Sequence, residues 1–237
     1  MEKVYTLVRN DLRHIFRDKT LMSFLFAPIL LLAFVRLFIP YITVQYPVLV
    51  PYHPLIMMFA SIQTAVLFGF ITSFLILEEK DENVLQAIRV LPLTPAYFIA
   101  YRLLFASAMS FTGALTVIRW GGLAYPGLGA SMMLALQCAL TAPFITLVVA
   151  TFARNKIEGV AFFKGVNLLL VLPVLSFFLT GPVRYLFAVI PVFWTFHLYD
   201  AALRNASIFG LFIGGLFVYV LIITLLFRQF RVRVFNR

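Results

Sequence analysis

Six long apolar runs restrict what this chain can fold into more than any other feature of its sequence. They cover residues 21–40, 55–77, 97–120, 130–152, 160–180 and 208–227. A helix needs about 20 apolar residues to cross a hydrocarbon core that is ~30 Å thick, and each run has that length. Only 12% of the 237 residues are charged, against about 25% in a soluble domain. The sequence therefore predicts a single-domain, all-α polytopic membrane protein with six transmembrane helices.

The distribution of basic residues predicts how these helices are oriented. An even number of spans places both termini on one side, together with residues 78–96 and 153–159. The segments on that side hold thirteen Lys and Arg residues, whereas the opposite loops hold two, Arg184 and Arg204. Because basic residues concentrate on the cytoplasmic side, we expect both termini and residues 78–96 to be cytoplasmic, in a bacterial or archaeal plasma membrane. The net charge of +10 is explained in this way without nucleic-acid binding.

Two further segments are predicted to lie along or within the membrane surface. Residues 1–20 combine apolar positions at helical spacing with basic ones, which indicates an amphipathic helix in the headgroup layer, although a solvated tail remains an alternative. Residues 181–207 are apolar, but their uncharged core of about fifteen residues spans only about 22 Å as a helix. Pro191 also interrupts it. We expect a pair of short helices that re-enter the outer leaflet before the last span.

Residues 78–96 are polar in a chain that is otherwise apolar. Asp81 is a predicted helix N-cap, Arg89 lies near the predicted C-terminal end, and Pro92 stops the helix. The apolar residues of this segment recur at helical spacing and form one stripe: Val84, Leu85, Ile88 and Leu91. Glu79, Asp81 and Arg89 flank that stripe. The pattern predicts a short cytoplasmic helix that offers an apolar ridge to a partner, or else a solvated loop whose stripe rests on lipid headgroups.

The order of these features resembles the type-2 export permeases of ATP-binding-cassette (ABC) transporters. The sharpest likeness is the segment "EEKDENVLQAIRVLPLTPAYFIAYRLL" after the second span. The residues that match the family pattern are Glu79, Lys80, Asp81, Leu85, Pro92, Leu93 and Thr94. Ile88 stands where that family usually has Leu. The opening "FRDKTLMSFLFAPILLLAFVRLFIP" is also similar to bacterial fluoroquinolone and multidrug exporters.

This resemblance implies a function and partners. In the family, the segment between spans two and three is a coupling helix that docks on an ATPase subunit. It implies two permease chains, identical or different, two ATPase chains, and export of a small amphipathic substrate such as a drug, a lipid or a peptide. The sequence contains no G-x-x-x-x-G-K-[ST] loop, so we expect this chain to bind no cofactor itself and to leave ATP and Mg²⁺ to the ATPase.

Two other functional classes remain as alternatives. An ion-coupled secondary transporter would need ionisable groups near the middle of the membrane, and no acidic residue lies in the middle of a span. Arg102 and the other basic residues within spans lie near span ends, where they can snorkel. An intramembrane protease would need an Arg where this chain has Asn83. We expect no catalytic residue and no metal site, because the three His residues fall in separate regions.

Three polar side chains lie nearest the middle of spans: Gln63, Thr64 and Asn167. They are candidates for lining a translocation path. Hydrogen bonding between helices of one subunit explains them equally well.

Overall fold

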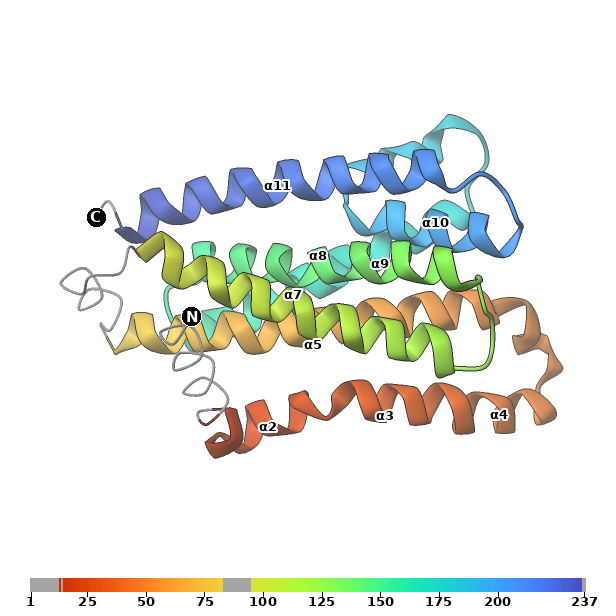
Figure 1. The fold of residues 1–237 in the computed structure, drawn as a ribbon, viewed down its shortest axis with the longest axis horizontal. Coiled ribbons are helices and arrows are strands. Elements are labelled where there is room, and N and C mark those ends of the chain that lie inside the picture. The colour runs from red at the N-terminus through yellow and green to blue at the C-terminus, as the bar shows by residue number, and fades with distance from the viewer. Residues whose placement is uncertain (1–12, 14, 83–94, 236–237) are drawn as a thin grey trace.

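The computed structural model describes residues 13, 15–82 and 95–235, which form helices joined by short turns. No β-strand occurs in these residues. Figure 1 shows long helices that run side by side along one axis of the molecule. Six of the helical segments described are long and apolar enough to cross a membrane. The expected all-α fold with six spans is therefore confirmed.

The first span is a chain of short helices with a π-helix in the middle. In order, these are α2 (Lys19–Leu25), α3 (Ala27–Ala33), the π-helix η1 (Phe34–Phe38) and α4 (Ile39–Gln45). Pro28 and Pro40 fall in the first turns of α3 and α4, where a missing backbone N–H costs little. Pro40 was expected to end this span. That expectation is wrong, because the helix continues through Pro40 to Gln45.

The remaining spans are longer than their apolar runs. A 3₁₀ turn, η2 (Pro47–Tyr52), leads into α5. The long helices are α5 (His53–Asp81), α7 (Pro95–Trp120), α8 (Leu128–Phe152), α9 (Lys156–Val171), which the 3₁₀ helix η4 (Leu172–Phe177) extends, and α11 (Phe209–Phe235). The helix α5 runs past its apolar run into the charged segment, and α11 continues beyond residue 227, where the last span was expected to end.

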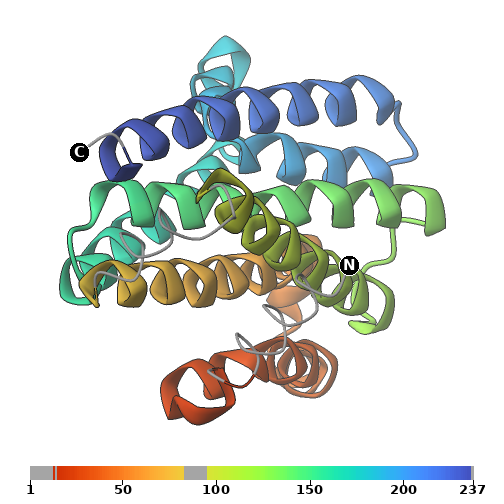
Figure 2. The same cartoon turned by 60° about the vertical axis from the view of Figure 1, so that its left-hand side comes forward.

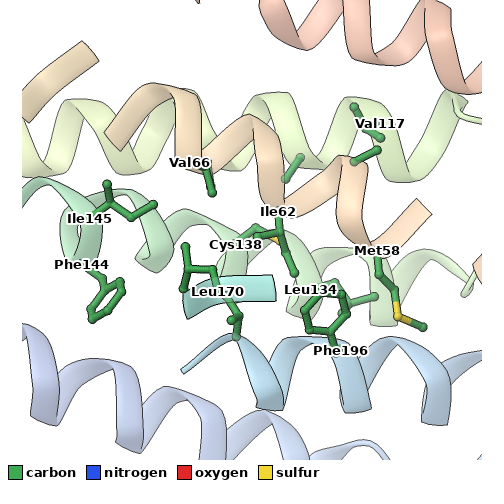
Figure 3. Packing of buried hydrophobic residues seen from close by; sticks show 14 of the residues in the cluster. Met58, Ile62, Val66, Val117, Leu134, Cys138, Phe144, Ile145, Leu170 and Phe196 are labelled. Carbon is green, nitrogen blue, oxygen red and sulfur yellow. The ribbon is translucent and has the colours of Figure 1, made fainter. Parts of the chain in front are cut away.

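Helices α5, α7 and α8 form the centre of the bundle and pack on one another. In both α5 and α8, 72% of the membrane-length window is buried. Figure 3 shows the contact region, where Met58, Ile62 and Val66 of α5 face Leu134 and Cys138 of α8. Further buried side chains reach this core from α7, α9 and α10. Close packing therefore fixes α5 against α8, and we expect the two helices to move together.

Gly69 allows α5 and α8 to approach closely. A Cβ atom at this position would lie 2.9 Å from the backbone oxygen of Ala142 and 3.0 Å from the Cβ atom of Ile145. We expect Gly69→Ala to lower the free energy of unfolding by about 1–3 kcal/mol, because overpacking forces backbone to move. The readout is the melting temperature in detergent. Gly165→Ala on α9 is the matched control, because an added Cβ there meets no atom within 4 Å. An unchanged melting temperature for Gly69→Ala would contradict the close crossing.

The first span, α9 and α11 lie at the periphery. Figure 2 shows the first span at one edge of the bundle, and Figure 1 places it at an edge as well. Only 17% of the membrane-length window of the first span is buried, with 22% for α9 and η4 and 11% for α11. Their outward side chains are mainly apolar, as a lipid-facing or subunit-facing surface requires.

Residues 181–207 form a pair of short helices, as predicted. These are the 3₁₀ helix η5 (Gly181–Val189) and α10 (Val192–Leu203). The indole Nε1 of Trp194 donates a hydrogen bond to the carbonyl oxygen of Ala188 at 2.9 Å, which ties the two helices together. The helix α10 buries Phe193 and Phe196 against the bundle. Figure 1 places α10 at the end of the bundle opposite the C-terminal end of α5.

Candidate functional site

The charged residues 78–81 extend α5 by one turn beyond its apolar run. Asp81 is the last residue of α5 and Glu82 follows it as the C-cap. Asp81 therefore does not cap the start of a new helix, contrary to the prediction. Five residues of the expected coupling helix lie outside the described part of the chain: Val84, Leu85, Ile88, Arg89 and Leu91. The described part contains Glu79 and Asp81, which the sequence placed beside the stripe.

Glu79 forms a two-pronged ion pair with Arg102 of α7. The Nη1 and Nη2 atoms of Arg102 lie 2.5 Å and 2.7 Å from the two carboxylate oxygens of Glu79. Arg102 is only 4% exposed and Glu79 is 19% exposed. The guanidinium also lies over the ring of Phe98, 4.5 Å from the ring centroid, and its Nε donates to the hydroxyl of Tyr101. The two carboxylate oxygens of Glu79 and the neighbouring aromatic ring together stabilise the buried guanidinium of Arg102, which offsets the free energy lost when it leaves water.

The same turn of α5 is also bound to the connection between α8 and α9. The ammonium of Lys80 donates to the carbonyl oxygen of Ala153 at 2.7 Å. Lys156 makes two contacts: its ammonium lies 2.9 Å from a carboxylate oxygen of Glu78, and its backbone N–H donates to Asp81 at 3.3 Å. Four consecutive charged residues therefore fasten the end of α5 to α7 on one side and to α9 on the other. We call these contacts of Glu78, Glu79, Lys80 and Asp81 the clamp.

Local capping orders the partner surface of the clamp. Asn155 is the N-cap of α9, and its side-chain oxygen accepts a hydrogen bond from the N–H of Glu158 at 2.9 Å. A carboxylate oxygen of Glu158 accepts in turn from the N–H of Arg154 at 2.8 Å. An Asn followed three residues later by Glu is a sequence pattern that favours a helix start. Lys156 is thus presented to Glu78 and Asp81 by an ordered first turn.

The clamp was not predicted from the sequence. Arg102 was placed among basic residues that snorkel from span ends, and the structure instead buries it in an ion pair. A signal for the pairing was nevertheless present. Glu79 lies two residues before the end of α5 and Arg102 seven residues after the start of α7, so both belong near the same end of two antiparallel helices. A buried cation needs a paired anion, and Glu79 is within reach.

The structure brings together two of the three mid-span polar residues. Gln63 of α5 donates from its side-chain nitrogen to the side-chain oxygen of Asn167 on α9, at 3.4 Å. Thr64 is elsewhere: it is fully buried, and its hydroxyl donates to the backbone oxygen of Ser61. A polar contact between helices of one chain therefore accounts for Gln63 and Asn167. Whether any of the three residues also lines a path for substrate stays a prediction.

A second buried polar group joins α8, α10 and α11. The hydroxyls of Thr141 and Tyr219 lie 2.7 Å apart, and Thr195 lies 3.4 Å from the same Tyr219 oxygen. The side-chain nitrogen of Gln137 donates to the backbone oxygens of Leu211 and Phe212. These neutral contacts are of the kind that hold helices together in lipid. Within the described ranges, no three His, Cys, Asp or Glu residues are grouped closely enough to hold a metal ion.

Comparison with known proteins identifies the family. The model of the Rv2686c-like fluoroquinolones export permease proteins matches residues 11–227. The Fluoroquinolones export permease protein Rv2686c of Mycobacterium tuberculosis (strain ATCC 25618 / H37Rv) is 28% identical over 233 residues, which covers 95% of this chain and 92% of that protein. The protein MT2760 of strain CDC 1551 / Oshkosh, with the same description, matches equally. No solved structure matches the chain. Because the family model covers most of its length, this chain belongs to the Rv2686c-like family of fluoroquinolones export permeases.

Proposed function

We propose that this permease is the membrane subunit of an exporter that is driven by ATP hydrolysis on a separate ATPase subunit. Residues 78–96 are the element that transmits the work of hydrolysis to the membrane helices. Val84, Leu85, Ile88 and Leu91 contact the ATPase, and Arg89 flanks them. The chain itself binds no cofactor, since ATP and Mg²⁺ belong to the ATPase.

The clamp is the observation that carries this proposal. A connection that only joins two helices needs no rigid attachment, whereas one that transmits force must be fixed to the helices it moves. Glu79 and Arg102 lock the end of α5 to the start of α7, and both helices belong to the packed centre of the bundle. A displacement of residues 83–94 by a partner therefore passes into α5 and α7 together. The contacts of Glu78 and Asp81 with Lys156 transmit the same displacement to α9.

The assembly comprises two permease chains and two ATPase chains in a plasma membrane. The apolar outer faces of the first span, α9 and α11 leave ample surface for lipid and for a second permease. The substrate is a small amphipathic molecule. Fluoroquinolones, named in the description of the family and of both relatives, are the substrates to test first.

The direct test is reconstitution. Purified permease and an ATPase subunit that co-purifies with it are placed in proteoliposomes, and fluoroquinolone export is measured with ATP, with a non-hydrolysable analogue, and with a proton gradient alone. We expect export with ATP only. Export by the permease alone, driven by the proton gradient, would instead establish a secondary transporter.

The orientation of the chain is tested by cysteine labelling. Cysteines replace Asn83 and Asn205 one at a time in a Cys138→Ser background, and intact cells are treated with a membrane-impermeant maleimide. Because residues 78–96 are proposed to be cytoplasmic and residues 181–207 external, we expect Asn205→Cys to be labelled in intact cells and Asn83→Cys only after permeabilisation. Cys138 is buried, so the wild-type chain is the low-labelling control. Labelling of both positions from one side would exclude six spans.

A further inference from the structure

A hollow of about 390 Å³ lies at the end of the bundle opposite the clamp. Three parts of the chain line it: the η2–α5 junction, the end of η4 and the last turn of α10. Figure 1 shows the start of α5 and α10 at this end, which is the outer end in the proposed orientation. The volume falls within the ~300–1,000 Å³ that is usual for small-molecule sites.

The lining of this hollow is mixed, unlike that of two others of similar size. The hollows on α9 and between α7, α8 and α11 are lined almost wholly by apolar side chains, as expected for surfaces that contact lipid. The outer hollow instead combines the aromatic residues Tyr52, Phe177 and Phe178 with the charged residues Asp200 and Arg204. An apolar wall with a few polar groups that fix orientation is typical of a ligand site.

Arg204 provides the polar recognition group. It is the C-cap of α10, one turn after Asp200, and its Nε is 3.0 Å from both carboxylate oxygens of Asp200. Within the described part of the chain, this contact uses Nε and leaves the two terminal nitrogens of a side chain that is 73% exposed. Two parallel N–H groups of a guanidinium match the two oxygens of a carboxylate. Asp200 holds the guanidinium by its Nε edge, which leaves the terminal edge for a ligand.

The walls of the hollow are held in place before any ligand arrives. The hydroxyl of Ser176 lies 2.9 Å from Nε2 of His197, and the His197 ring stacks on Phe177 with centroids 4.9 Å apart. These contacts fasten η4 to α10. On the other side, the hydroxyl of Thr43 lies 2.9 Å from Nε2 of His53, which fastens the start of α5 to α4. A site ordered in advance loses less entropy on binding.

We propose that this outer hollow binds an aromatic carboxylate of drug size. The carboxylate accepts hydrogen bonds from the terminal nitrogens of Arg204, and the ring lies against Tyr52 and Phe178. Fluoroquinolones carry a carboxylate on an aromatic ring system and belong to this chemical class. The inference rests on the proposed export function and adds a subsite through which the substrate passes on the outer side.

The test measures binding without the ATPase and without nucleotide. Purified permease in nanodiscs is titrated with a fluoroquinolone and with its carboxyl methyl ester, using the fluorescence anisotropy of the ligand and subtracting empty nanodiscs. Arg204→Gln is compared with Arg184→Gln, because Arg184 is the other basic residue of the outer segments and does not line the hollow. We expect Arg204→Gln to weaken binding of the acid roughly fivefold to tenfold, a value between the effect of an exposed ion pair and that of a buried hydrogen bond to a charged group, and that of the ester less than about twofold.

Each outcome decides between the proposals. If the acid and the ester bind wild-type permease equally, or if Arg204→Gln weakens both alike, the carboxylate site is wrong and the aromatic residues serve only the membrane interface. Export that continues in that case leaves the coupling proposal standing. Carboxylate-dependent binding without any ATP-driven export would refute the coupling proposal alone.

Discussion

Replacing Leu85 and Ile88 together by Asp should abolish ATP-driven export while the permease still inserts and folds. If both side chains are buried in a groove on the ATPase, the double substitution removes about 1.5–3 kcal/mol of apolar burial for each, or roughly 3–6 kcal/mol in total. The added carboxylates cost more free energy if they enter that groove. Association with the ATPase should then weaken by about two to four powers of ten.

The measurement is co-purification of the ATPase with tagged permease, followed by fluoroquinolone-stimulated ATP hydrolysis in proteoliposomes. The double variant Leu85→Met and Ile88→Leu is the matched control. It keeps apolar volume at both positions and should retain association within about 1.5 kcal/mol. An unchanged melting temperature of the permease alone separates loss of docking from loss of folding. If the Asp variant exports at the wild-type rate, the apolar stripe does not dock on the ATPase.

The number of spans could be predicted because the bilayer imposes it. A crossing needs a fixed length of apolar helix, and this requirement is local, so it can be read from composition. The pair of short helices at residues 181–207 was predictable for the same reason, since its uncharged core is too short to cross. Figures 1 and 2 show these elements arranged around the central helices, an arrangement that composition does not specify.

The ends of the spans were less predictable, because helices do not stop where apolar residues stop. Glu and Lys are good helix formers, so α5 continues through residues 78–81 once the preceding turns are formed. The first span was expected to end at Pro40. In the structure Pro40 occupies the first turn of α4, directly after the π-helix η1. Both deviations depend on neighbouring turns, which a residue-by-residue pattern does not capture.

The clamp could not be derived from periodicity, because it joins residues distant in sequence through the packing of three helices. The sequence marked Glu79 and Asp81 as functional, but it assigned them to contacts with a partner protein. In the structure Glu79 bonds Arg102, and Asp81 accepts from the backbone of Lys156. Their described contacts anchor the segment that the sequence had identified. The apolar stripe and its anchors therefore have different tasks: the stripe is proposed to receive force and the clamp to transmit it.

Substitution of Arg102 by Gln should destabilise the permease more than Gly69→Ala does. The variant leaves the carboxylate of Glu79 in a site where it is 19% exposed, and breaking one partner of a buried ion pair typically costs about 3–5 kcal/mol. For a chain of this length, a loss of about 3 kcal/mol corresponds to a fall in melting temperature of roughly 6–12 °C. Arg184→Gln is the control, because Arg184 is exposed and contacts the neighbouring Tyr185. It should change the melting temperature by less than about 2 °C, as exposed substitutions usually do.

The double variant Glu79→Gln and Arg102→Gln separates the ion pair from the volume of the side chains. Because two neutral amides can bond to each other without an unpaired charge, we expect it to be more stable than Arg102→Gln, with a coupling free energy of about 0.5–3 kcal/mol. In this double variant, ATP hydrolysis should nevertheless be poorly coupled to export. The reason is that single amide contacts replace the two-pronged ionic contact that fixes α5 against α7. ATP hydrolysis per exported molecule should therefore rise in the double variant at a temperature where it is fully folded. If that ratio stays at the wild-type value, the ion pair contributes to stability only, and the transmission of force must use the contacts with Lys156 or the packed core.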